Sequence, residues 1–326
     1  MYKLVFFGLG TIGREILKTA LLKRSFKIAG GVDVNPDIIG KDLGELIGEE
    51  KLGVNVVDSI KKIEEADVVV HSTSSFLKIT LPQFKEIMEA GFSVISTCEE
   101  LFYPFHFHKK EAEMLDKIAK ENGVSILGAG INPGFVLDTL VSFITTVSRD
   151  IEKITAERYL DASKRRKQLQ LKVGASLSKE EFDTLKKDGK LGHIGLPESL
   201  TYIFDSLGWK IKDIENSLEP VIAEEDFETE YLKIKKESVR GQHQVAKGIS
   251  EDGREIKLIL RMAVGEKESF DRIRIKGIPD IDLKIDGGVH GDIGTSTVII
   301  NYIPGLMKLP PGLHSTRDLP LPHFTM

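Results

Sequence analysis

Six residues near the amino terminus combine three glycines at a spacing that suits phosphate binding. They read Gly8-Leu9-Gly10-Thr11-Ile12-Gly13, and they lie between an apolar run at 2–7 and an amphipathic stretch at 12–22. In a strand–turn–helix unit, the three glycines allow a tight turn, close approach of a pyrophosphate and close helix packing. The N–H groups at the helix start, from Thr11 and Ile12, attract the phosphates. The segment therefore predicts a dinucleotide site.

Asp33 bears on which dinucleotide binds. It ends the second apolar run, at 26–32, about 25 positions after the glycine segment begins, where a ribose-binding acid is expected. A carboxylate there accepts hydrogen bonds from both ribose hydroxyls and repels a 2′-phosphate, so NAD is favoured over NADP. NADP stays open because Lys41 or Arg14 could hold a phosphate. The alternative role for Asp33 is to cap a turn before Asn35-Pro36.

Two further polar segments follow predicted strands. Ser72 and Thr73 begin the loop after the run at 66–71, and Glu99 and Glu100 come just past the run at 93–97. Such loops lie at the carboxyl edge of a parallel sheet, where ligands bind, so we expect Ser72 and Thr73 to flank the cofactor. Two acids beside a buried strand are unusual because charges near a core are costly. We expect one carboxylate to enter the cleft, hold a substrate ammonium and accept its proton; a solvated loop is the alternative.

Other reactive side chains fit chemical roles less well. His71 is expected to be a strand-end residue rather than a catalyst. Cys98 has the chemistry of a nucleophile, as in acylating aldehyde dehydrogenases, but no nearby motif supports that role, and a small residue packed at the strand end is preferred. The histidines of Phe105-His106-Phe107-His108 have no third ligand at a diagnostic spacing, so no metal site is predicted.

Strands that alternate with helices in the first part of the chain predict an α/β fold, a Rossmann doubly wound parallel sheet. The expected strands are 2–7, 26–32, 66–71, 93–97 and 125–127. The expected helices are 12–22, 81–90 and 109–121. We assign this dinucleotide-binding domain to residues 1–134.

The rhythm of the sequence changes after Asn132-Pro133-Gly134. An apolar helix is expected at 135–147, and strands are expected at 153–160, 231–239, 243–249, 255–264 and 270–275. Turn residues at 250–253 predict a hairpin. We therefore expect a second α+β domain, built on a mainly antiparallel sheet, at 135–294 for substrate binding and oligomerisation. A helix at 295–307 and an extended tail form the remaining part, 295–326, which can return to the first domain.

Composition limits the class of protein. The 326 residues carry a formal net charge of -5, which gives no reason to expect nucleic acid or an anionic membrane as a partner. A single cysteine excludes an intrachain disulfide and fits a reducing cytoplasm. No stretch is long and apolar enough to span a bilayer, and the first residues are interpreted as a strand rather than a signal peptide. We expect a cytoplasmic homodimer that binds a small molecule.

Six motifs occur in order along the chain, at 8–13, 96–101, 128–135, 192–195, 290–292 and 311–313. The glycine segment is generic, whereas the Cys-Glu-Glu and Asn-Pro-Gly-Phe segments are much more specific. Together these motifs resemble the 2,4-diaminopentanoate dehydrogenases and native amine dehydrogenases. The resemblance covers nearly the whole chain.

The resemblance implies NAD(P)-dependent oxidative deamination of an amine. The family's substrate is 2,4-diaminopentanoate, formed in ornithine fermentation, and its products are 2-amino-4-oxopentanoate and ammonia. A glutamate of the Cys-Glu-Glu segment is implicated in catalysis, and we favour Glu100 over Glu99. Asn132 is a candidate to bind the cofactor amide or the substrate. An arginine of the basic stretch 164–167, for which we choose Arg166, is a candidate clamp for a substrate carboxylate, although a solvated face is the commoner role.

His193 and His290 are candidates for the wall of the cleft, and a structural role is the alternative for each. Three other functions compete with amine oxidation. A dihydrodipicolinate reductase would show a His-His pair before a lysine and an Asp-Ala-Pro-Ser-Gly-Thr run, and neither is present. A homoserine dehydrogenase typically carries a lysine where this chain has Glu99 and Glu100. An NAD(P)-binding regulator would keep the glycine segment without needing a carboxylate in the cleft.

Overall fold

The computed structural model describes residues 1–324, and it divides into two compact units. The first unit contains Met1–Phe135 together with the chain from His290 onward, and the second contains Val136–Val289. The chain thus leaves the first unit once and comes back to it. Among the residues described, no helix has the length and apolar character needed to cross a membrane.

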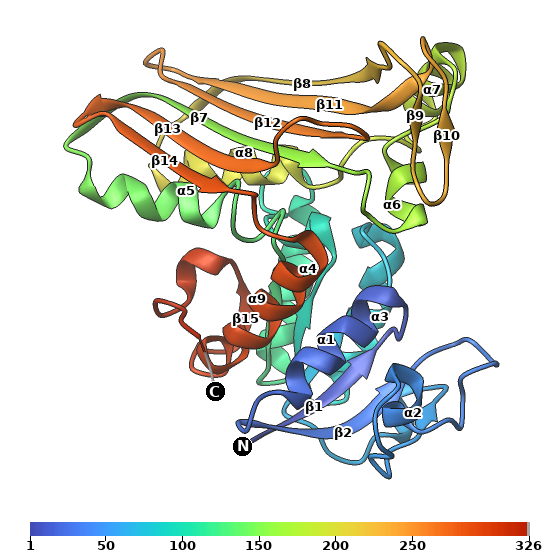
Figure 1. Ribbon diagram of the computed structural model, residues 1–326. Helices are drawn as coiled ribbons and strands as arrows, with labels where there is room; N and C mark the ends of the chain where they lie inside the picture. The colour runs from blue at the N-terminus through green and yellow to red at the C-terminus, as the bar shows by residue number, and fades with distance from the viewer. Residues whose placement is uncertain (325–326) are drawn as a thin grey trace. The chain divides into compact units, whose positions relative to one another are not determined.

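The first unit is built on a parallel sheet of seven strands in its described residues (Figure 1). In chain order these are β1 Tyr2–Phe7, β2 Phe26–Val32, β3 Val56–Val57, β4 Val68–His71, β5 Ser93–Ser96, β6 Ser125–Gly128 and β15 Gly312–His314. The helices of this unit are α1 Thr11–Leu21, α2 Leu43–Ile47, α3 Leu77–Glu89, α4 Lys109–Glu121 and α9 Gly291–Leu306, with 3-10 turns η1 Ile60–Lys62, η2 Glu99–Leu101 and η4 Thr316–Asp318.

The strand order places the site-forming loops side by side. The order is β15-β6-β5-β4-β1-β2-β3, so β1 pairs with β2 on one side and with β4 on the other. The chain reverses its direction of travel across the sheet between β1 and β4, and ligands of open parallel sheets bind at such a switch point. The predicted Rossmann sheet is confirmed, and β15 extends it at the β6 edge.

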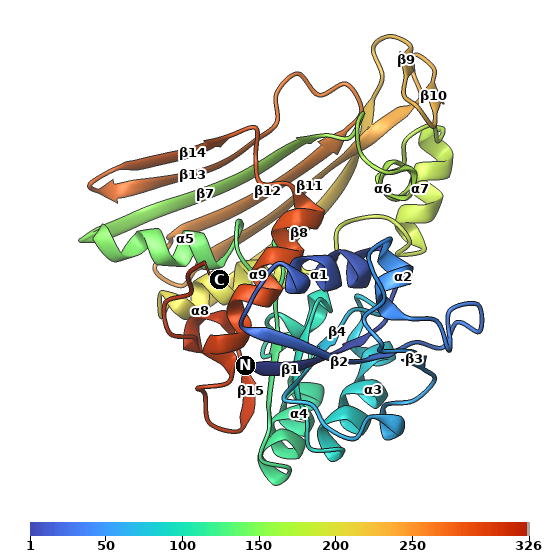
Figure 2. The same cartoon turned by 60° about the horizontal axis from the view of Figure 1, so that its bottom comes forward.

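Helices cover both faces of this sheet, as Figure 2 shows. On one face, Leu4 and Phe6 of β1 pack with Ile16 of α1 and Ile299 of α9. On the other face, the alternate β1 residue Val5 joins a second cluster that includes residues of α3 and α4. Because both faces are buried, the strands are continuously apolar, and this explains why the sequence predicts them well.

The second unit contains a six-stranded mixed sheet in the order β14-β13-β7-β12-β11-β8. Its long strands are β7 Asp150–Asp161, β8 Ile211–Ile222, β11 Val239–Ser250, β12 Glu255–Ala263, β13 Phe270–Ile278 and β14 Ile281–Asp286. All neighbours are antiparallel except β7 and β12. The remaining elements are α5 Thr139–Ile144, η3 Thr145–Val147, α6 Lys167–Lys172, α7 Lys179–Lys187, α8 Leu196–Ser206 and the two-residue strands β9 Phe227–Glu228 and β10 Lys233–Ile234.

A buried ion pair joins two strands of this sheet to the end of the unit. The side chains of Arg158 on β7 and Asp271 on β13 are each 2% exposed, and Nη1 of Arg158 lies 3.1 Å from Oδ1 of Asp271. Arg158 also donates to the carbonyl of Val289, whose N–H donates to Asp271 Oδ2 at 2.7 Å. Burial lowers the pKa of Arg158 and raises that of Asp271, and their mutual attraction opposes both shifts.

Several predicted elements were wrong or misplaced. The strand expected at 231–239 does not form; only Lys233–Ile234 pairs, and Glu237 adopts a left-handed conformation (φ 70°) that no strand accommodates. The helix expected from residue 135 begins at Thr139, whose N–H is capped by the Asp138 carboxylate at 2.6 Å. Strand β8 was not predicted. It is an edge strand with most of its residues exposed, so it lacks the apolar pattern of a buried strand.

Two helices begin four residues earlier than predicted. Helix α3 begins at Leu77 rather than Leu81, because its first N–H is bonded by a carboxylate from a distant loop. Helix α9 begins at Gly291 rather than Thr295, because the His290 side chain accepts the N–H of Ile293. Neither contact is visible in the local hydrophobic pattern.

The buried ion pair generates a stability prediction. Changing Arg158 to Met leaves the Asp271 carboxylate buried without its cation, and we expect a loss of about 3–5 kcal/mol in the free energy of unfolding. The measurement is urea denaturation followed by circular dichroism. The double variant Arg158→Met/Asp271→Leu removes both charges and should recover part of the loss. A single variant within about 1 kcal/mol of the wild type would contradict this role.

Candidate active site

The glycine segment forms a tight turn between β1 and α1. Gly8 has φ +91°, and a Cβ there would lie 2.7 Å from the carbonyl oxygen of Ser72. A Cβ on Gly13 would lie 2.0 Å from the carbonyl oxygen of Gly8. Both positions therefore require glycine to keep the turn closed against the β4 loop and the helix close to the strand.

Gly10 differs from Gly8 and Gly13. It has an extended backbone, and a Cβ built on it would meet nothing within 4 Å. It is the N-cap of α1, and no side chain caps this helix start. The positive end of the helix dipole faces this open space. The first N–H groups of the eleven-residue helix, beginning with those of Thr11 and Ile12, lie there. An open cradle at an uncapped helix start fits the diphosphate of a dinucleotide.

Asp33 lies directly beside the glycine turn. Its Oδ2 accepts the N–H of Leu9 at 2.6 Å, and its Oδ1 accepts the N–H of Asn35 at 2.9 Å. The carboxylate therefore caps its own turn and also orients the glycine segment, so the turn-capping role is present in the structure. A carboxylate oxygen has two lone pairs, so the same group keeps acceptor capacity for ribose hydroxyls.

Ser72 and Thr73 begin the β4 loop at the switch point. The Ser72 hydroxyl donates to the Gly8 carbonyl at 2.8 Å, and the Ser72 N–H donates to the Phe7 carbonyl at 2.8 Å. Thr73 is exposed, and its hydroxyl donates to Gln83 Oε1 at 2.7 Å. The two loops that flank the switch point are thus bonded to each other, as a shared ligand site requires.

The acid pair begins η2, and two residues separate it from the end of β5. Oε2 of Glu100 accepts the N–H of Leu77, the first residue of α3, at 2.6 Å. Nε2 of His108 lies 3.8 Å from the same oxygen, and the Glu100 side chain is 17% exposed. Glu99 is also partly buried. The Glu100 carboxylate is therefore held in a fixed position by a helix start, at the carboxyl edge of the sheet.

The backbone links this acid to the β4 loop as well. The Glu100 N–H donates to the Ser75 carbonyl at 3.2 Å, and the Cys98 thiol donates to the same carbonyl at 3.3 Å. Burial raises the pKa of Cys98 to about 12, so the thiol stays protonated and is a poor nucleophile. Among residues 1–324, no cluster of three His, Cys, Asp or Glu side chains is arranged to hold a metal ion.

Asn132 lies in the loop that follows β6. This loop is tightly folded, because a Cβ on Gly134 would lie 2.3 Å from the Gly130 nitrogen. The N–H of Ile131 donates to Thr295 Oγ1 of α9 at 3.3 Å. The loops after β1, β4, β5 and β6 follow adjacent strands, so the glycine segment, Ser72, the acid pair and Asn132 share one edge of the first unit's sheet.

The other three predicted residues lie elsewhere in the chain. His290 is exposed at the start of α9, and its Nδ1 accepts the Ile293 N–H at 3.4 Å, which is a capping role. Arg166 and His193 belong to the second unit. The buried Gln244 side chain holds the backbone of His193 from both sides: its Oε1 accepts the N–H at 2.7 Å and its Nε2 donates to the carbonyl at 3.2 Å.

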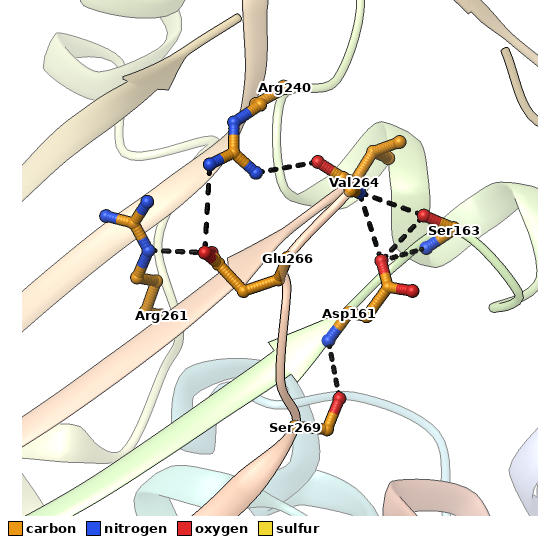
Figure 3. A network of polar contacts seen from close by, with 8 residues as sticks. Asp161, Ser163, Arg240, Arg261, Val264, Glu266 and Ser269 are labelled. Carbon is orange, nitrogen blue, oxygen red and sulfur yellow. Dashed lines mark hydrogen bonds and ion pairs between the residues drawn. The ribbon is translucent and has the colours of Figure 1, made fainter. Parts of the chain in front are cut away.

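A polar network in the second unit fixes the strand end that precedes Arg166 (Figure 3). Asp161 Oδ1 accepts the N–H and hydroxyl of Ser163 at 3.0 and 2.6 Å and the N–H of Gly265 at 3.1 Å. In the same network, Glu266 accepts from Arg261 Nε at 2.7 Å. These bonds hold the end of β7, from which the chain continues into the basic stretch 164–167.

Sequence reasoning missed the partners that position the acid pair. Leu77, Ser75 and Thr80 of the β4 loop and α3 bond the Cys98–Glu100 segment, and His108 was considered only as a metal ligand. The structure shows a helix start without a local capping side chain, at Phe76, whereas the sequence predicts the start at Leu81 and so gives no signal of it. Such a start requires an acceptor from elsewhere, and the sequence does not say which residue supplies it.

Comparisons with known proteins show which family the sequence resembles over its whole length. Residues 135–326 match the family described as 2,4-diaminopentanoate dehydrogenase C-terminal domain, and residues 2–126 match dihydrodipicolinate reductase, N-terminus. The 2,4-diaminopentanoate dehydrogenase of Acetoanaerobium sticklandii is 31% identical over 335 residues, which cover 99% of this chain and 95% of that protein. An amine dehydrogenase of Streptomyces virginiae is 26% identical over 173 residues, covering 50% of this chain and 47% of that protein.

A solved structure supports the fold. The amine dehydrogenase from Mycobacterium smegmatis superposes with a TM-score of 0.88 at 21% identity, and the match covers 99% of this chain and 97% of that one. At this identity the likeness shows a common fold. It extends over both units, including the mainly antiparallel sheet of the second.

The contrast between two glycines gives a direct test of the cradle. Gly10→Ala should fold with an unchanged melting temperature, because its Cβ meets no protein atom. The added methyl group enters the space assigned to the diphosphate, so NAD(H) affinity should fall about tenfold or more in calorimetric titration. Gly13→Ala is the contrasting variant, and it should lower the melting temperature. Unchanged cofactor affinity in Gly10→Ala would show that the cradle is misassigned.

Proposed function

The chain belongs to the 2,4-diaminopentanoate dehydrogenase family, and from this premise we propose that it oxidatively deaminates 2,4-diaminopentanoate to 2-amino-4-oxopentanoate and ammonia. The reaction uses NAD(P)⁺ and is reversible as a reductive amination. The A. sticklandii relative carries that name, and the motifs at 96–101 and 128–135 had indicated the same family. The family membership makes a nicotinamide cofactor part of the reaction.

One observation supports the proposal: an anchored carboxylate follows β5, and only the β4 loop separates it from the glycine turn along the edge of the sheet. Glu100 follows β5, whose neighbour β4 flanks the switch point, and its N–H bonds Ser75 of the β4 loop. A negative charge suits a cationic amine better than a neutral carbonyl. A reductase or dehydrogenase acting on a neutral carbonyl has less use for this charge, and a regulator that only binds the dinucleotide has none.

The carboxylate of Glu100 does the proton chemistry in this mechanism. It accepts a proton from the substrate ammonium and so frees the lone pair of the amine nitrogen. That lone pair drives departure of a hydride from the carbon bonded to the nitrogen. The nicotinamide, when bound, supplies the hydride acceptor. After returning its proton to solvent, Glu100 accepts a second proton from the water that adds to the iminium carbon. Glu100 then gives that proton to the substrate nitrogen, the C–N bond breaks, and ammonia leaves as the hydroxyl becomes the ketone. The sum is the substrate ammonium plus NAD(P)⁺ plus water giving ketone, ammonium, NAD(P)H and a proton.

The anchoring of Glu100 is compatible with this role. An ionised carboxylate has about four lone-pair sites, so accepting the Leu77 N–H at 2.6 Å leaves capacity for the substrate. Glu99 is the alternative base, one residue earlier in the same turn.

We propose that the cofactor is held by Gly8, Gly10, Thr11, Ile12, Gly13, Asp33, Ser72, Thr73 and Asn132.

The remaining residues concern recognition of the diamino acid. Arg166 carries a planar guanidinium suited to bidentate binding of the substrate carboxylate. His193 and His290 are proposed as further polar contacts to the substrate. The Gln244 side chain bonds the His193 N–H and carbonyl, so the point from which the His193 side chain extends is held in place.

Finer points of the proposal concern the cofactor, the assembly and the cell. We propose that NAD is preferred over NADP, because the Asp33 carboxylate lies against the glycine turn. We also propose a homodimer. The single cysteine, Cys98, fits a reducing cytoplasm, and the proposed substrate fits ornithine degradation.

The catalytic assignment predicts a specific kinetic defect. Glu100→Gln keeps an oxygen that can accept the Leu77 N–H, so folding and cofactor affinity should persist. Without the proton acceptor, kcat for diamino acid oxidation should fall about 10²- to 10⁴-fold, measured by NADH absorbance. Glu99→Gln is the matched control and should retain turnover. Near-normal turnover in both variants would reject the assignment, and collapse in Glu99→Gln alone would move it to Glu99.

The role of Asp33 predicts a change in cofactor choice. Asp33→Ala removes the charge that repels a 2′-phosphate, so the ratio of kcat/KM for NADP to that for NAD should rise about tenfold or more. Asp33→Asn keeps an acceptor for the Leu9 N–H and separates loss of charge from loss of the turn. Unchanged selectivity in both variants, measured with saturating amine, would contradict the ribose-binding role.

A further inference from the structure

His71 occupies an unusual position at the end of the switch-point strand. It is the last residue of β4, it is fully buried, and its ring contacts those of Phe7 and Phe84, with centroid distances of 5.5 and 4.6 Å. Burial of a polar ring is costly unless both nitrogens are bonded. They are: Nδ1 lies 2.9 Å from Ser96 Oγ, and Nε2 lies 2.7 Å from Gln83 Oε1.

The partners determine where the ring proton lies. Gln83 Oε1 is a carbonyl oxygen and only accepts, so Nε2 carries the proton and Nδ1 is the acceptor for the Ser96 hydroxyl. Burial lowers the pKa of His71 to about 4, which agrees with a neutral ring. Thr73 Oγ1 lies 3.0 Å from Nε2 and also donates to Gln83, which completes the network.

The network connects the two loops that carry the proposed function. On one side it reaches Thr73, in the loop that flanks the cofactor. On the other side it reaches Ser96, whose Oγ accepts the N–H of Cys98 at 3.0 Å, immediately before the acid pair. One imidazole thus bridges neighbouring strands at the point where each turns into its functional loop.

We propose that His71 is a positioning residue. Through Ser96, Thr73 and Gln83 it fixes the position of the segment after β5, which carries Glu100, relative to the β4 loop. The inference rests on the proposed function, in which Glu100 must meet an amine beside the nicotinamide. His71 contacts neither reactant and moves no proton in the reaction. It sets the distance between the groups that do, and misplacement of about 1 Å can reduce turnover about 10²-fold.

The test compares variants that separate the hydrogen bonds from the packing. His71→Phe keeps an aromatic ring in the same core and removes every hydrogen bond that His71 makes. Phe84→Leu is the matched control, because it loosens the packing on the ring and leaves the bonds intact. Ser96→Ala removes the Nδ1 partner and also the acceptor of the Cys98 N–H, so in this variant the exchange of segment 72–80 is the diagnostic readout. It serves if His71→Phe does not fold. His71→Asn restores a short polar side chain on the Ser96 side.

Two readouts decide the outcome. In the cofactor-free protein, hydrogen–deuterium exchange of segments 72–80 and 96–102 should accelerate in His71→Phe and Ser96→Ala and not in Phe84→Leu. In turnover with the diamino acid, kcat should fall about tenfold or more in His71→Phe, with KM for NAD within about threefold, and should recover partly in His71→Asn. Unchanged exchange in His71→Phe and Ser96→Ala, or equal effects in Phe84→Leu, would overturn the proposal.

The two proposals fail separately. If the wild-type protein does not oxidise the diamino acid, the proposed function is wrong, and the exchange experiment still decides whether His71 holds the two loops together.

Discussion

The hydrogen bond from the Leu77 N–H to the Glu100 carboxylate is the interaction on which the site depends. It joins the helix that follows β4 to the acid that follows β5, at 2.6 Å. The helix start needs an acceptor because no local side chain caps it, and the acid needs a donor because it is mostly buried. Each satisfies the other, so the charge lies at a fixed place next to the switch point.

The rest of the first unit serves this placement. A parallel sheet brings the loops after β1, β4, β5 and β6 to one edge, and two glycines whose Cβ atoms would collide with backbone keep the turn closed. Asp33 and Ser72 then bond the glycine turn from the β2 and β4 sides. The edge therefore combines an uncapped helix start, which favours phosphates, with an anchored carboxylate, which favours an ammonium.

The sequence predicts the sheet and the glycine turn because both arise from local patterns: buried strands are continuously apolar, and a turn of this kind demands Gly8 and Gly13. It does not predict β8, whose exposed polar residues gain order from pairing with β11, nor the break at Glu237. The start of α3 at Leu77 and the network around His71 depend on residues about 12 to 25 positions apart. Those contacts arise from tertiary packing, which periodicity does not encode.

The most direct test of the central claim is a crystal structure of the protein with NADH and 2,4-diaminopentanoate bound. The account predicts the reacting amino nitrogen about 3 Å from a Glu100 carboxylate oxygen, with Leu77 still donating to that side chain. An amine held by other groups, with the carboxylates of Glu99 and Glu100 both turned away from the nicotinamide, would contradict it.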